Sequence, residues 1–254
     1  MNSPRHRQRS KARRHRSSRA AADNPQPPEP EIALQIRQVW DLPTRLSHWA
    51  IVTLLLIQLM SSQFPLLPTT WHLWAGYLLL LVVLFRTGWG LVGSDSARFG
   101  PMLSSLRGLP AYLPLLFSNR PTHWPGHNPV GALSSLLLLA LLLISCVSGL
   151  FVETWAEYRG PLAERVSRST SLWLADLHSV IRWPIYGLVL IHIGAVSGYL
   201  LFKGEDRIGP IFGNGRIAVR PGNDLQQQST RRAMVVLTLC LALLLTIVVF
   251  GPIA

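Results

Sequence analysis

The sequence predicts an all-α integral membrane protein, a bundle of four transmembrane helices followed by a fifth transmembrane helix near the C-terminus. Hydrophobic residues make up 49% of the 254 residues and charged residues only 14%, a balance typical of chains embedded in a bilayer. The apolar residues also gather in separate segments that are long enough to cross a membrane. These predicted helices cover residues 46–64, 71–91, 130–152, 174–202 and 233–250.

Residues 1–35 are typical of a disordered, basic arm on the cytoplasmic side of the membrane. Eight Lys and Arg and no acid lie between residues 5 and 19, so this stretch alone carries +8 of the net charge of +12. It lacks the apolar centre of a secretory signal. A basic arm beside a membrane helix retains the N-terminus in the cytoplasm and contacts anionic lipid. We therefore expect the lipid bilayer, and not nucleic acid, as its partner.

The loop charges predict the orientation of the helices. Ten Lys and Arg precede the first helix or lie at its start, up to Arg45, and four Arg against one Asp lie at or after the end of the second helix. Six Lys and Arg follow the fourth helix, whereas the loop over residues 65–70 has no charge, and the third loop together with the start of the fourth helix has three Arg against four acids, the last of them Asp176. Because cytoplasmic loops carry the excess of Lys and Arg, we expect a multi-pass membrane protein with the N-terminus inside and the C-terminus outside.

We expect three parts after the arm: a four-helix core over residues 36–215, a polar linker over residues 216–232 and the additional helix within residues 233–254. The additional helix carries no histidine. It is expected to pack or anchor, with docking of another membrane subunit as the alternative.

The fourth helix carries two histidines, His178 and His192, where a lipid-facing helix carries none. Their separation of 14 residues places them within about 40° of one helix face and about 21 Å apart along it. By the predicted topology, His72 lies at the outer level of His178, and His48 lies at the inner level of His192. The four histidines therefore form two pairs matched in depth.

Two facing neutral imidazoles are the axial ligands of a six-coordinate b-type haem, so the pairs predict two non-covalent haem b groups and a four-helix diheme core. One haem would lie between His48 and His192 and the other between His72 and His178. Neither Cys146 nor Cys240 belongs to a CxxCH motif, which excludes covalent c-type attachment. Both cysteines are expected to pack inertly.

Arginines near the histidines are candidate partners of the anionic haem propionates. Arg182 follows His178 by one turn, and Arg86 and Arg45 lie near the inner surface. The alternative for Arg86 and Arg45 is that they extend to the surface as topology anchors. Small residues are expected beside the ligands to make room for the haems, with ordinary helix packing as the alternative. They are Gly76, Gly187, Gly194 and Gly198.

Two features leave alternatives open. His123 and His127 lie in a Pro-broken loop before the third helix, where a surface or capping role competes with a loop metal site or a contact to quinone or a partner. Pro184 follows His178 by six residues, and a kink there would shift the outer site.

Several phrases occur together in one order: VWDLPTRLSHW (Val39 to Trp49), WHLWAGYLLLLVVLFRTGWGLVGS, ARFGPMLSSLRG, GHNPVGAL (Gly126 to Leu133) and the helix with two histidines. Over residues 37–215 the chain resembles the superfamily of prokaryotic cytochrome b561 and nickel-iron hydrogenase b-type cytochromes. The resemblance implies a diheme core whose ligands fall on the four histidines named above. It departs from the family in its fifth helix, and in the acids that often precede the family's fourth helix.

The resemblance implies electron transfer across or within the membrane between a quinone pool and a soluble or membrane-bound redox partner, a cytochrome or a dehydrogenase. Whether the protein turns over quinone as an oxidoreductase stays open. The main alternative is a membrane anchor and electron-relay subunit of a hydrogenase or similar dehydrogenase. A histidine-lined permease is the third, but the chain has neither internal repeats nor the midplane acids that would favour it.

Overall fold

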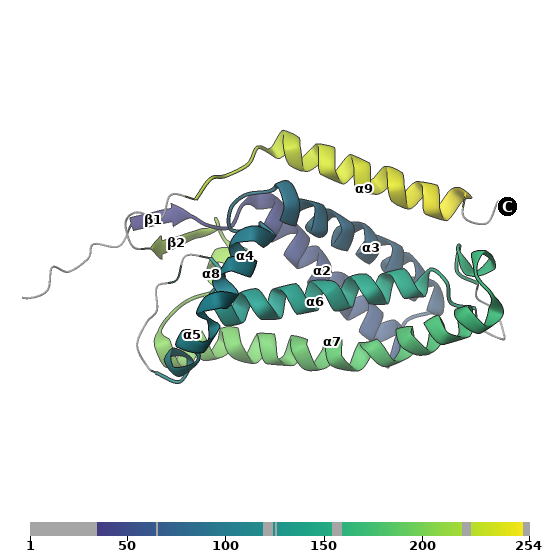
Figure 1. The fold of residues 1–254 in the computed structure, drawn as a ribbon, viewed down its shortest axis with the longest axis horizontal. Coiled ribbons are helices and arrows are strands. Elements are labelled where there is room, and N and C mark those ends of the chain that lie inside the picture. The colour runs from purple at the N-terminus through teal and green to yellow at the C-terminus, as the bar shows by residue number, and fades with distance from the viewer. Residues whose placement is uncertain are drawn as a thin grey trace, which may run out of the picture. The chain divides into compact units, whose positions relative to one another are not determined.

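The structure is a computed structural model that describes residues 35–64, 66–118, 124, 126–153, 159–219 and 225–250. Within these residues, five helices are long and apolar enough to cross a membrane, which confirms the predicted fold class (Figure 1). They are α2 (Leu42–Ser62), α3 (Thr69–Val92), α6 (Pro129–Gly149), α7 (Arg168–Lys203) and α9 (Thr230–Phe250). Residues 1–34, and with them nearly all of the predicted basic arm, lie outside the described residues.

Polar caps fix where the long helices begin. Asp41 accepts the Thr44 amide at the start of α2, Asn128 accepts the Gly131 amide at the start of α6, and Ser167 caps α7. Such side chains satisfy amides that have no partner within the helix. Helix α7 ends at Gly204, whose φ of 63° suits a residue without Cβ.

Helix α7 runs without a break through Pro184. Its 36 residues correspond to about 54 Å, more than the hydrocarbon core of about 30 Å requires. The helix begins six residues before the predicted start at residue 174. Both of its histidines therefore lie on one continuous helix, as the sequence predicted.

The first four long helices form a bundle in which α2 packs on α3, α3 on α6, and α6 on α7. Their shared core contains Leu54, Leu79, Val83, Leu142 and Ile181. Cys146 packs beside this core as an unbonded cysteine.

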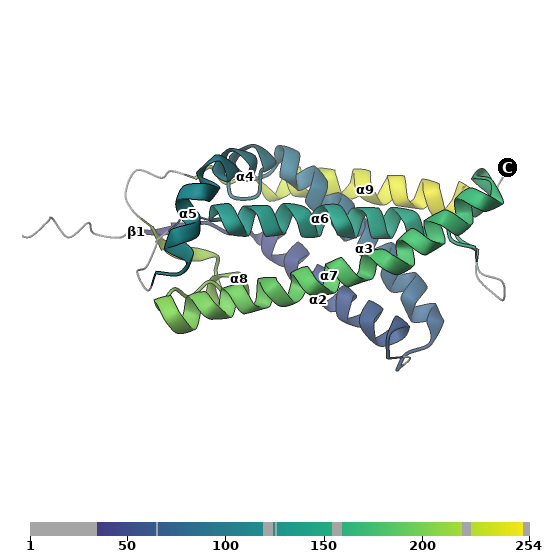
Figure 2. The same ribbon diagram turned by 60° about the horizontal axis from the view of Figure 1, so that its bottom comes forward.

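Helix α9 packs on α3, beside the bundle (Figures 1 and 2). Phe85 and Trp89 of α3 form one cluster with Ala233, against which Cys240 also packs. Gly88 permits this close approach, because a Cβ atom there would lie 2.9 Å from Cγ1 of Val236.

Short elements gather at the end of the bundle where α6 begins and α7 ends (Figure 2). Between α3 and α6 the chain forms α4 (Phe99–Ser105), a 3₁₀ turn (Leu106–Gly108) and α5 (Leu109–Leu116). Helix α8 (Gly209–Phe212) follows α7. A second 3₁₀ turn (Ala163–Arg165) lies at the other end of the bundle, between α6 and the start of α7. The sequence analysis predicted none of these elements.

A two-stranded antiparallel sheet, also not predicted, joins β1 (Gln35–Gln38) to β2 (Arg216–Val219). Strand β2 lies in the segment that was expected to be a polar linker. Gly215 precedes it with a φ of 75°, and its carbonyl accepts the amides of Val39 and Trp40 at 2.8 and 2.9 Å. A Cβ at Gly215 would lie 1.9 Å from the Trp40 carbonyl oxygen, so this position requires glycine.

Candidate functional site

The bundle brings the four predicted histidines together as two pairs. His48 of α2 faces His192 of α7 with ring centroids 6.5 Å apart and planes inclined by 49°. His72 of α3 faces His178 of α7 with centroids 6.2 Å apart and planes inclined by 85°. Each pair is therefore made of one histidine from α7 and one from a different neighbouring helix.

These spacings fit an imidazole–metal–imidazole arrangement. A metal–imidazole bond is about 2 Å long and the ring centroid lies about 1 Å beyond the nitrogen, so two rings across one metal have centroids about 6 Å apart. Among the described residues, no group of three or more His, Cys, Asp and Glu side chains is placed to hold a metal ion. A metal between only two protein ligands needs equatorial ligands of its own, which the haem macrocycle supplies.

The His72–His178 pair lines a cavity of about 500 Å³, within the range of roughly 300–1,000 Å³ usual for cofactor and ligand sites. Most of its lining is apolar. Gly149 of α6 allows the His178 ring to pack closely against α6, because a Cβ atom there would lie 3.1 Å from Cε1 of the ring. The predicted Gly76 lines the same cavity.

The other predicted glycines lie on α7 and do not contact a neighbouring helix closely. A Cβ at Gly187 or Gly194 would meet no atom within 4 Å, and a Cβ at Gly198 would meet only Phe202, at 3.9 Å. Tight helix packing therefore does not explain Gly187 and Gly194.

Hydrogen bonds hold the rings of the second pair. Nδ1 of His178 lies 2.8 Å from the Ser145 carbonyl oxygen and 3.4 Å from Oγ of Ser148. Nδ1 of His72 lies 3.4 Å from Oγ of Ser61 on α2. Gln58 donates to the backbone carbonyl of His72 at 3.0 Å. The sequence analysis missed these partners; their signal was a set of hydroxyl and amide side chains within otherwise apolar spans.

The first pair is positioned through the start of α2. The Asp41 carboxylate accepts the Thr44 amide at 2.8 Å and also the indole N–H of Trp89 on α3 at 3.0 Å. Both Asp41 and Trp89 are buried. Asp41 therefore joins the helix that carries His48 to the neighbouring α3, a role that the sequence analysis did not find.

The three arginines predicted to bind propionates differ in their hydrogen bonds. The Nε atoms of Arg45 and Arg182 are inaccessible to solvent and have no hydrogen-bond partner among the residues that the structure describes. Arg182 lines the cavity of the His72–His178 pair. Arg86 differs, since its Nη1 donates to the Ala97 carbonyl at 3.2 Å. Buried unpaired donors are costly, so Arg45 and Arg182 are suited to bind an anionic group.

His127 is half-buried and packs against Trp40, with ring centroids 4.7 Å apart and its Nδ1 atom inaccessible to solvent. Desolvation, and to a lesser degree the positive charge of Arg86, lowers the pKa of His127 from 6.5 to about 3, so the ring is neutral. The enclosed Nδ1 atom argues against a simple surface role. The companion residue His123 lies outside the described residues.

His127 and Trp124 line a second cavity of about 480 Å³ near the end of the bundle where α6 begins. Arg98, Met102 and Ser96 contribute to the same lining. Among the described residues, the Nε atom of Arg98 and the Nδ1 atom of His127 are both buried without a hydrogen-bond partner, while another nitrogen of Arg98 pairs with Asp95. The cavity is thus lined by both apolar and polar side chains.

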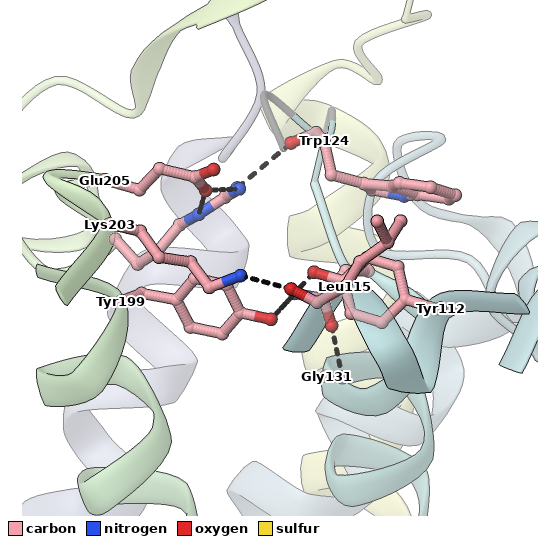
Figure 3. Close-up of polar contacts among 9 residues, drawn as sticks. Tyr112, Leu115, Trp124, Gly131, Tyr199, Lys203 and Glu205 are labelled. Atoms are coloured by element: carbon pink, nitrogen blue, oxygen red, sulfur yellow. Dashed lines mark hydrogen bonds and ion pairs between the residues drawn. The ribbon is translucent and has the colours of Figure 1, made fainter. Parts of the chain in front are cut away.

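A polar cluster joins α5, the start of α6 and the end of α7 (Figure 3). The Tyr199 hydroxyl lies 2.7 Å from the Tyr112 hydroxyl and accepts the Asn128 amide at 2.9 Å. Lys203 donates to the Leu115 carbonyl at 2.6 Å. Arg207, which pairs with Glu205, donates to the Trp124 carbonyl at 3.0 Å. The cluster fixes the short helix α5 and Trp124 against the bundle.

The chain matches the sequence model of the prokaryotic cytochrome b561 family over residues 39–204. The match covers α2 to α7 and contains all four paired histidines, whereas α9 lies beyond it. No curated protein and no solved structure matches the chain. The chain therefore belongs to the prokaryotic cytochrome b561 family.

Proposed function

We propose that the protein is a diheme b-type cytochrome that carries electrons across the membrane between a quinone pool and a redox partner. Membership of the cytochrome b561 family makes it a membrane cytochrome of b type that takes part in electron transfer. We propose in addition that it binds two haems, that the four paired histidines are their ligands, and that a quinone exchanges electrons with them. The observation that carries it is the pair of ring spacings, 6.5 and 6.2 Å, built on one helix.

In this proposal His48 and His192 hold one haem, and His72 and His178 hold the other. Bound haem iron supplies one-electron redox chemistry. With one imidazole from each helix holding it, a bound haem would supply electron transfer rather than binding of a substrate at the metal. Arg45 and Arg182, with their free Nε atoms, and Arg86 provide the cationic partners for propionates.

The two pairs lie at different depths of the bilayer. The 14 residues between His178 and His192 correspond to a rise of about 21 Å along α7, most of a hydrocarbon core about 30 Å thick. From the loop charges we infer that the His48–His192 pair lies toward the cytoplasm of a bacterial inner membrane and the His72–His178 pair toward the outside. Electrons passing between the pairs then cross the membrane.

Quinone exchange is assigned to the second cavity. A quinone is a flat ring with two carbonyl acceptors, and the cavity is lined by the Trp124 indole and by the side chains of His127 and Arg98. We expect His127→Gln to slow reduction of the haems by a short-chain quinol in stopped-flow mixing while both haems stay bound. Reduction by quinol at the unchanged rate would remove the quinone from this cavity.

The haem assignment is tested by replacing each histidine with alanine and measuring the haem-to-protein ratio of the purified protein. Wild type is expected to bind two haems per chain. His48→Ala and His192→Ala should lose the same haem, and His72→Ala and His178→Ala the other, as judged from the visible spectra. His15→Ala, a histidine outside the family match, is the matched control and should retain both haems.

Loss of the same haem from His48→Ala and His72→Ala would contradict the pairing. Co-purification of the wild-type protein with a hydrogenase or another dehydrogenase would favour the alternative role of an anchor and electron-relay subunit.

A further inference from the structure

The serine hydroxyls beside the His72–His178 pair donate their protons to backbone carbonyls. Ser61 donates to the Ile57 carbonyl at 2.7 Å, and Ser148 donates to the Ser145 carbonyl at 2.9 Å. Each of these distances is much shorter than the 3.4 Å from either hydroxyl to its histidine. A hydroxyl has one proton to donate. Toward the rings, both serine oxygens therefore act as acceptors.

An acceptor at Nδ1 fixes the tautomer of the ring. His72 must carry its proton on Nδ1 to donate to Ser61, and His178 must do the same to donate to the Ser145 carbonyl at 2.8 Å. In a neutral imidazole the other nitrogen, Nε2, then holds the free lone pair. Both rings of this pair are thus prepared to bind a metal through Nε2.

The described contacts of the His48–His192 pair include no such hydrogen bond. Within the part of the chain that the structure describes, Nδ1 of His48 is inaccessible to solvent and has no hydrogen-bond partner. Arginines do not explain the difference, since Arg86 interacts electrostatically with His48 and Arg182 with His178. The two pairs therefore differ chiefly in the hydrogen bonds made by their Nδ1 atoms.

A hydrogen-bond acceptor behind a ligating histidine orients the ring and makes it a more basic ligand. A more basic ligand stabilises the oxidised metal and lowers its reduction potential. Resting on the diheme function proposed above, we propose that Ser61 is a positioning residue for His72, that the Ser145 carbonyl with Ser148 positions His178, and that these groups make the His72–His178 haem the lower-potential centre.

The test is a potentiometric titration of full-length Ser61→Ala, followed through the visible bands of the two haems. Ser61 is the informative position, because His178 keeps its backbone acceptor in any variant. We expect the lower of the two midpoint potentials to rise, by up to a tenfold change in the oxidised-to-reduced ratio, which is about 59 mV for one electron. The higher midpoint potential should not move.

Two variants make the result specific. Ser62→Ala removes the next serine of α2, which donates to the Gln58 carbonyl at 2.6 Å and makes no hydrogen bond to His72 among the described contacts, and it should leave both midpoint potentials unchanged. Ser61→Thr keeps the hydroxyl and should retain the wild-type value. Ser148→Ala, whose histidine retains the 2.8 Å carbonyl contact, should shift the same potential by less than Ser61→Ala.

Unchanged midpoint potentials in Ser61→Ala, equal shifts in Ser62→Ala, or a shift of the higher potential would overturn this inference. In each case wild type would still bind two haems, so the diheme function would stand. Fewer than two haems in wild type would instead overturn the proposed function itself.

Discussion

Asp41 is the residue on which the position of His48 depends most. Its carboxylate caps α2 and also accepts the buried indole N–H of Trp89, so one side chain fixes both the start of α2 and its contact with α3. Loss of a helix cap costs about 0.5–2 kcal/mol. An unsatisfied buried donor costs about 1–3 kcal/mol more.

We therefore expect Asp41→Ala to lower the free energy of unfolding by roughly 2–4 kcal/mol. The haem assigned to His48 and His192 should be released at a lower temperature than the other haem. Thermal melting in detergent, followed by circular dichroism and by the visible spectrum, measures both effects. Asp41→Asn is the matched control, because asparagine also caps helices well, and it should be less harmful. Release of both haems together would show that Asp41 does not act on one site.

His127 makes the stability of the protein depend on pH. The folded protein holds its pKa at about 3, below the usual 6.5, chiefly because the ring is desolvated. The unfolded chain therefore binds a proton that the folded chain does not, and stability is lost as the pH falls below 6.5. The loss is about 1.4 kcal/mol per pH unit, or about 2 kcal/mol at pH 5.

His127→Gln removes this titration. Between pH 7 and pH 5 the melting temperature of the variant should fall less steeply than that of wild type, since the remaining histidines are common to both proteins. Parallel pH profiles would contradict the assigned protonation state of His127.

Helix α7 shows which features of the site a sequence makes predictable. The spacing of His178 and His192 follows from helix geometry alone, and the depth of their partners follows from loop charges, so both pairs were predictable without a structure. The hydrogen bonds of Ser61 and Ser148 were not, because they depend on the rotation of each helix about its axis. That rotation is set by side-chain packing between helices.

The unpredicted sheet has a similar cause. Strands β1 and β2 pair residues that are far apart in the chain, such as Gln35 with Val219, and neither strand has a distinctive pattern of its own. Short strands of this kind are stabilised by their tertiary context rather than by local preference. The helices α4 and α5 were also not predicted, because their short, Pro-containing sequences show no clear helical periodicity.

Helix α7 must keep both histidines in register if it serves two haems. Insertion of one alanine after Gly187 would rotate His192 by about 100° relative to His178. We expect this variant to lose one haem and retain the other, as measured by the haem-to-protein ratio. An alanine inserted after Ser229, between the family match and α9, is the control and should retain both haems. Retention of both haems after the α7 insertion would contradict the shared-helix arrangement.

The whole molecule divides into a haem-binding bundle that lies within the family match and a peripheral helix α9 beyond it. None of the four histidines lies on α9, and its described contacts are chiefly with α3. In lipid, helices associate mainly through close side-chain packing, and α9 packs closely on α3. Helix α9 should therefore affect stability more than cofactor binding.

Gly88→Leu tests this division in the full chain. The added side chain would collide with Val236, because even a Cβ atom lies 2.9 Å from its Cγ1, and should force α9 away from α3. We expect a lower melting temperature with both haems still bound. Gly100→Leu is the matched control, since a Cβ there meets no atom within 4 Å. Loss of haem from the Gly88→Leu variant would show that α9 contributes to haem binding and would contradict this division.

The central claim is that the bundle binds two haems, each between two imidazoles. Electron paramagnetic resonance of the oxidised, full-length protein tests it most directly, with the spins counted against the protein concentration. The account predicts two low-spin haem signals of equal intensity, together amounting to two haems per chain. A single haem per chain, or a high-spin signal in the intact wild-type protein, would contradict it.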